Sequence, residues 1–124
     1  MALSSTQLLC FRGLLFLMLL LVMHLATTQD AYPVISDVND KSKHMLTFVS
    51  LAFLLDFSWP KNKLSVIKIA LLMSYGLLIE VVQLGLPYRE FSLLDLLADS
   101  VGIFLYWCVV PLLRYVPLLR LRWQ

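Results

Sequence analysis

Long apolar runs separated by short polar segments dominate this sequence and limit the folds that it can adopt. The runs cover residues 8–26, 44–59, 64–86 and 93–110, and each segment between them contains Pro and charged residues. A helix needs about 20 residues to span the ~30 Å hydrocarbon core of a bilayer. The pattern therefore predicts an all-α membrane protein, a bundle of four transmembrane helices.

The composition supports a membrane protein and excludes other classes. Of the 124 residues, 60% are hydrophobic and 15% are charged, and the mean hydropathy is +0.84. A soluble domain this short has too much surface to bury so many apolar side chains. The net charge of +2 provides no large basic face for nucleic acid. Cys10 and Cys108 form neither a disulfide framework nor a metal-binding spacing.

Four segments follow one another along the chain. Residues 1–28 hold the first helix, which is either a membrane anchor or a signal peptide. We favour the anchor because no clear A-x-A cleavage site follows it. Residues 29–43 form a polar loop outside the cytoplasm, residues 40–110 form a three-helix core, and residues 111–124 form a basic cytoplasmic tail that begins at Pro111.

The distribution of Lys and Arg predicts the orientation of the bundle, because cytoplasmic segments carry an excess of these residues. The split is seven against three, with Arg12, Lys61, Lys63, Lys68, Arg114, Arg120 and Arg122 on one side and Lys41, Lys43 and Arg89 on the other. We therefore expect both termini and the turn at residues 60–63 in the cytoplasm. The turn at residues 85–92 then faces outward.

Polar side chains gather at the predicted outer ends of three helices. The set comprises Asp40, Lys41, His44, Glu80, Gln83, Arg89, Asp95 and Asp99. Spacings of three or four residues place the members from each helix on one helical face. At 1.5 Å per residue, Glu80 and Asp99 lie at about the same depth, each roughly 9–10 Å from the turn that joins their helices. The sequence therefore predicts one outward-facing polar pocket.

Several of these residues also have a structural explanation. Ser92 and Asp95 match the S-x-x-D capping pattern at the start of the fourth helix. Interfacial contacts or helix–helix hydrogen bonds would explain His44, Gln83 and Arg89. Glu80 and Asp99 are harder to explain in this way, because an unpaired charge below the membrane interface costs at least ~2.5 kcal/mol.

A second charged pair lies near the predicted inner end of the bundle. Asp56 is near the end of the second helix and Lys68 is near the start of the third. We expect them to form an ion pair at the cytoplasmic interface or to reach the interface separately. Either role is structural, and its contribution should be under about 1 kcal/mol, as for exposed ion pairs.

Four short motifs occur in a fixed order between residues 40 and 106. They are D-K-x-x-H from Asp40, E-x-x-Q from Glu80, P-x-R from Pro87 and D-x-x-A-(N/D)-x-x-G from Asp95. In this order and spacing they resemble the VanZ-like family of small bacterial membrane proteins, whose named member is linked to resistance to the lipoglycopeptide teicoplanin. Asp99 stands where that family usually has Asn. The resemblance implies a multi-pass protein of the bacterial cytoplasmic membrane and a link to antibiotic resistance, but it implies no reaction.

The function that we favour is a pocket that binds or modifies a cell-envelope component, such as a lipid-linked or cell-wall precursor. We assign catalytic acid–base roles to Glu80, Asp95 and His44, and substrate binding to Lys41, Gln83, Arg89 and Asp99. We expect no cofactor and assign no metal site, although the carboxylates and His44 could hold a divalent cation.

Two other functions remain open. One is a non-catalytic scaffold or accessory subunit for envelope or exopolysaccharide machinery, and the other is a proton-coupled carrier with Glu80 and Asp99 as the relay. The expected partners are membrane lipids or a lipid-linked precursor, an envelope enzyme, or a second copy of the chain. The small-residue pair Ala98 and Gly102 would allow close helix packing, either within the monomer or between copies. Nucleic acid is not an expected partner. The chain lacks G-x-S-x-G and H-E-x-x-H motifs, so the sequence does not decide whether it is an enzyme.

Overall fold

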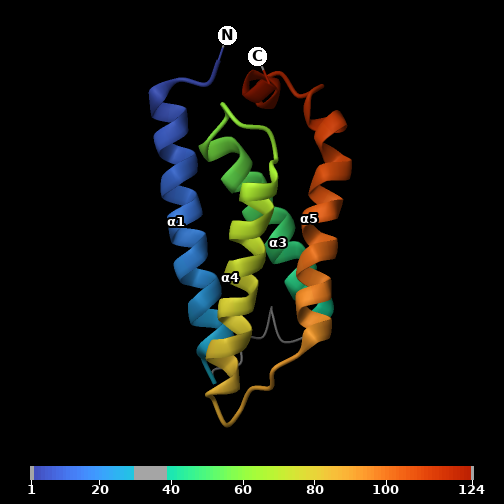
Figure 1. Ribbon diagram of the computed structural model, residues 1–124. Coiled ribbons are helices and arrows are strands. Elements are labelled where there is room, and N and C mark those ends of the chain that lie inside the picture. Colours follow the sequence, from blue (N-terminus) through green and yellow to red (C-terminus); the bar gives the residue numbers. More distant parts are fainter. Residues whose placement is uncertain (1, 30–38, 124) are drawn as a thin grey trace.

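The computed structural model describes residues 2–29 and 39–123, and every regular element in these ranges is helical. The elements are α1 (Ser5–Thr27), α3 (Asp40–Ser58), α4 (Val66–Leu84), α5 (Leu93–Leu113) and a short 3-10 helix, η1 (Leu119–Trp123). The four long helices run side by side as a bundle (Figure 1). The predicted all-α four-helix architecture is confirmed. Most of the predicted polar loop, residues 30–38, lies outside the described residues.

Local sequence signals determine where the helices begin. Ser4 and Gln7 form a capping box at the start of α1. The Asn39 side chain accepts a hydrogen bond from the backbone N–H of Lys41 and caps α3. At its other end, α5 continues through Pro111 to Leu113 and so passes the point where the sequence predicts a break. Helices in membrane proteins tolerate Pro because neighbouring groups can satisfy the carbonyl that it leaves unpaired.

Three of the four helices, α1, α4 and α5, are long and apolar enough to cross a membrane. The fourth, α3, carries four charged side chains: Asp40, Lys41, Lys43 and Asp56. It also supplies more buried apolar side chains than any other helix. Many large apolar side chains on the other three helices are exposed, as expected where hydrocarbon replaces water. The polar helix therefore lies against its neighbours, and the apolar helices provide the lipid-facing surface.

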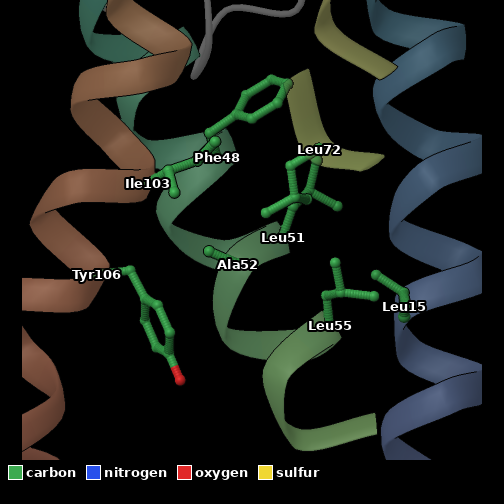
Figure 2. Packing of buried hydrophobic residues seen from close by; sticks show 8 residues of the cluster. All are labelled: Leu15, Phe48, Leu51, Ala52, Leu55, Leu72, Ile103 and Tyr106. Atoms are coloured by element: carbon green, nitrogen blue, oxygen red, sulfur yellow. The ribbon is translucent and has the colours of Figure 1, made fainter. Parts of the chain in front are cut away.

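The apolar core receives side chains from all four long helices. Figure 2 shows its members: Leu15, Phe48, Leu51, Ala52, Leu55, Leu72, Ile103 and Tyr106. Four of the eight belong to α3, which lies among the other three helices. The contacts between these side chains fix the relative position of the helices and hence of the polar groups at their ends.

Two glycines allow close approach between helices. A Cβ atom on Gly102 would lie 2.5 Å from the backbone oxygen of Met45, so the backbones of α5 and α3 nearly touch there. A Cβ atom on Gly76 would lie 2.6 Å from Oδ2 of Asp99. Gly102 therefore brings α3 against α5 within the monomer, as the small-residue pair with Ala98 predicts. Gly76 leaves room for a buried carboxylate.

The beginning of α1 and the short helix η1 lie at the same end of the bundle, and the connection between α4 and α5 lies at the opposite end (Figure 1). The described ends of the chain therefore share one side, as the predicted topology requires. The assignment of that side to the cytoplasm rests on the Lys and Arg distribution alone.

Candidate functional site

Three helices bring five charged or ionisable side chains together at the end of the bundle where α4 joins α5. This polar cluster consists of Lys41 and His44 from α3, Glu80 from α4, and Asp95 and Asp99 from α5. All five belong to the set that the sequence places in one pocket. Their neighbourhood follows from the bundle, because the start of α3, the end of α4 and the start of α5 meet at the same level.

His44 lies between the two aspartates of α5. Its Nδ1 is 2.7 Å from Oδ1 of Asp99, which is a hydrogen-bond distance. Its Nε2 is 3.4 Å from Oδ2 of Asp95, and the other oxygen of Asp95 forms an ion pair with the Lys41 ammonium group. The side chain of Asp99 is 1% exposed and that of Lys41 is 42% exposed. The polar cluster therefore extends from the bundle interior to its surface.

Glu80 is fully buried and contacts the start of α5. Its Oε2 accepts a hydrogen bond of 2.9 Å from the backbone N–H of Ser92. In a complete capping box, the Asp95 side chain would accept that hydrogen bond. The Ser92 hydroxyl still caps α5 by accepting from the backbone N–H of Asp95, at 3.4 Å. Because Glu80 accepts the Ser92 N–H hydrogen bond in place of Asp95, the Asp95 carboxylate is left to face Lys41 and His44.

Two buried carboxylate oxygens in the polar cluster have no hydrogen-bond partner among the described residues. They are Oε1 of Glu80 and Oδ2 of Asp99. A buried acceptor without a partner costs about 1–3 kcal/mol, and more if it is charged. Such groups are rare in native structures and call for an explanation such as a bound ion or a catalytic role. The unpaired oxygens distinguish the polar cluster from a network that only holds helices together, in which every buried polar atom would have a hydrogen-bond partner.

Gln83 and Arg89, which the sequence places in the same pocket, form hydrogen bonds with the end of α1. The Gln83 side chain donates to the backbone oxygen of Ala26 at 3.1 Å. Arg89 donates to the backbone oxygens of Leu25 and Thr28 at 3.2 and 3.1 Å. The last carbonyl groups of a helix lack partners within the helix, so these donors satisfy α1. Sequence reasoning missed this contact because it did not predict that α1 ends beside α4.

Asp56 lies in a second buried group, roughly 18 Å from His44 along α3 at 1.5 Å per residue. Its carboxylate accepts from Lys68 Nζ at 2.9 Å, from Arg122 Nη2 at 2.7 Å and from the Tyr106 hydroxyl at 2.7 Å. We call these four residues the inner charged group. Arg122 reaches it from η1, because the chain after α5 folds back over the end of the bundle (Figure 1).

Of the two expected arrangements of Asp56 and Lys68, the structure shows the ion pair, but the expectation that it is an exposed interfacial pair is wrong. The side chains of Asp56, Lys68 and Arg122 are 1%, 6% and 2% exposed. The sequence analysis did not predict that the basic tail would supply Arg122, or that Tyr106 would point to the same carboxylate. Burial removes the solvent screening on which the small expected contribution depended.

Comparison with known proteins identifies the family of this chain. Residues 14–114 match the sequence profile described as VanZ/LLP1. The chain belongs to the VanZ/LLP1 family. No curated protein and no solved structure gives a significant match. The family match includes every residue of the polar cluster and also Asp56, Lys68 and Tyr106, whereas Arg122 lies beyond it.

Proposed function

We propose that this VanZ-family membrane protein binds or modifies a cell-envelope component through its polar cluster. The observation that carries the proposal is the pair of unpaired buried oxygens on Glu80 and Asp99, beside His44. A group that only fastens helices together gains stability by satisfying every buried polar atom. Unpaired acceptors beside an ionisable ring are instead expected where a ligand, an ion or a reacting group completes the contacts.

The chemistry of the polar cluster suits a hydroxyl-bearing ligand whose phosphate group reaches the exposed end of the cluster. Lys41 is the most exposed member and carries a cation, so it is suited to contact a phosphate group of a lipid-linked precursor. His44 has one ring nitrogen oriented by Asp99, which is the usual arrangement for a histidine that transfers protons. Asp95 lies between Lys41 and His44, and its carboxylate would stabilise a positive charge on either of them.

We also propose that the polar cluster faces outward from the bacterial cytoplasmic membrane. The Lys and Arg distribution supports this orientation, with seven of ten such residues at the opposite side. Reporter fusions after Lys43 and Arg89 should therefore read out as external, and fusions after Lys63 and Gln124 as internal. An external reporter at Gln124 would contradict the orientation, because the polar cluster would then face the cytoplasm.

Deletion of the gene should change the sensitivity of cells to envelope-directed antibiotics. We expect an altered inhibitory concentration of a lipoglycopeptide and accumulation of a lipid-linked precursor, measured by susceptibility assays and mass spectrometry of envelope lipids. Complementation with the wild-type gene should restore both, and an inhibitor of a cytoplasmic target should act equally on all strains. Unchanged lipids and unchanged susceptibility to a range of envelope stresses would contradict the proposal.

A scaffold function is the second candidate, and a specific observation favours it. Gln83 and Arg89 connect α4 and its turn to the end of α1, so two of the seven proposed site residues already have structural partners. In a scaffold, the polar cluster would hold α3 to α5 and present a surface to envelope enzymes. The effect of Glu80→Gln, considered in the Discussion, distinguishes the two functions.

A further inference from the structure

We infer that the polar cluster holds a divalent transition-metal ion, such as Zn²⁺ or Mn²⁺, with His44, Glu80 and Asp95 as its ligands. One candidate ligand atom from each of these residues lies within 4.8 Å of the other two. The three residues come from three different helices, so the packed bundle brings them together. The inference rests on the proposed function in that it specifies the chemistry of the same site, and with a metal bound His44 would act as a ligand and not as a proton-transfer group.

The orientation of His44 fits a metal ligand. Histidines that bind metals usually donate their second ring N–H to a carboxylate or carbonyl oxygen, which fixes the ring and the tautomer. Asp99 provides that acceptor at 2.7 Å from Nδ1. Nε2 is then the ligand atom, and it lies 3.4 Å from Oδ2 of Asp95. Two tetrahedral ligand atoms, each ~2.0–2.1 Å from Zn²⁺, are separated by about 3.4 Å.

Glu80 supplies an independent observation that points to a ligand. It is fully buried, and its Oε1 has no hydrogen-bond partner among the residues that the structure describes. Its other oxygen is held by the backbone N–H of Ser92 at 2.9 Å, which fixes the position of the carboxylate. A metal ion bound to Oε1 would satisfy an acceptor that is otherwise unpaired.

The charge of the polar cluster also favours a dication. A bound metal ion requires deprotonated carboxylate ligands and a neutral histidine. In that state Lys41 would balance only one of the three carboxylate charges of Glu80, Asp95 and Asp99. A divalent cation would balance the remaining two, and buried charge without compensation is strongly unfavourable. The imidazole nitrogen in the ligand set suits Zn²⁺ and the two carboxylates suit Mn²⁺, whereas Mg²⁺ and Ca²⁺ are usually bound by oxygen atoms alone.

Metal content and Co²⁺ spectroscopy of the purified full chain test the inference. The protein should be purified in detergent without a histidine tag, stripped with a chelator and reloaded with Zn²⁺, Mn²⁺ or Co²⁺. We expect one ion per chain by mass spectrometry, and visible Co²⁺ absorption bands from a nitrogen and oxygen ligand set. His44→Gln should abolish both, and Asp99→Asn should weaken Zn²⁺ binding about tenfold by removing the charged partner of the ring.

The chain contains one other histidine, His24, so His24→Gln is the matched control and should bind metal as the wild type does. Melting temperatures show whether each variant is folded. If His44→Gln does not fold, Glu80→Gln replaces it, because glutamine can still accept from Ser92. Substoichiometric metal in folded wild type, or equal binding by the site variants and the wild type, would overturn the inference.

The failure of this inference can be distinguished from failure of the proposed function. A chain that binds no metal, but whose envelope phenotype depends on Glu80, would overturn the metal site and leave the proposed function intact. A chain that binds one ion through His44 and produces no envelope phenotype would support the metal site and contradict the proposed function.

Discussion

Asp56→Asn should lower the free energy of unfolding by about 3–5 kcal/mol, because it removes one partner of a buried ion pair. The Asp56 side chain is 1% exposed and is the only carboxylate that contacts Lys68 and Arg122 within the described residues. Without its charge, two buried cations would face each other uncompensated. Asparagine preserves the size of the side chain but has one acceptor oxygen, so the substitution removes the charge together with one of the two acceptors that Lys68, Arg122 and Tyr106 share.

Thermal melting in detergent and the protein level in membranes measure this effect. Asp40→Asn is the matched control, because the Asp40 side chain is 76% exposed on the same helix. It should melt close to the wild type. If Asp56→Asn also melted close to the wild type, Asp56 would not need to be ionised, and the inner charged group would not be held together by its charges.

The inner charged group also shows how far sequence reasoning can extend. The proximity of Asp56 and Lys68 could be predicted, because a short turn joins their helices and fixes the distance between them. Arg122 could not be predicted, because it is 66 residues away and reaches Asp56 only when η1 folds over the bundle. Hydropathy and charge counts describe a basic tail, but they do not give its path.

At the opposite end of the bundle, the depth of a residue along its helix correctly predicts that some side chains join the polar cluster and wrongly includes others. Equal rise per residue predicted that Glu80 and Asp99 would lie at one level, and the structure places both in the polar cluster. The same reasoning did not separate Gln83 and Arg89 from them. These two side chains turn toward α1, and the direction of a side chain around a helix depends on packing that depth alone does not determine.

The capping pattern at the start of α5 was ambiguous for a related reason. Ser92 and Asp95 fit a local rule, and a local rule cannot detect a competing partner from another helix. Glu80, which belongs to α4, accepts a hydrogen bond from the backbone N–H of Ser92, and Asp95 is therefore left to contact Lys41. A residue that a short motif assigns to helix capping is therefore free to join a polar cluster when a side chain from another helix makes the capping hydrogen bond instead.

Glu80→Gln should abolish the envelope phenotype and leave the protein folded. Glutamine has the same shape as glutamate, and its side-chain oxygen can still accept from the N–H of Ser92. The start of α5 should therefore stay capped and the helices should stay packed. The change removes the negative charge and replaces the unpaired acceptor Oε1 with a donor, so proton transfer, cation binding and contact with a cationic ligand are lost together.

The measurements are complementation of the deletion strain, protein level in membranes and melting temperature in detergent. Glu90→Gln is the matched control, because it removes a negative charge from an exposed side chain in the turn that follows α4. It should complement fully.

If the polar cluster is a functional site, the Glu80→Gln variant should behave like the deletion strain, although its protein level is normal and its melting temperature is near that of the wild type. In a scaffold, it should complement as long as the protein is folded, because only the shape of the bundle matters. Complementation at normal protein level would therefore contradict a functional site. Glu80 and Asp99 are the most deeply buried ionisable groups of the polar cluster, and the charge of Glu80 would then have no function.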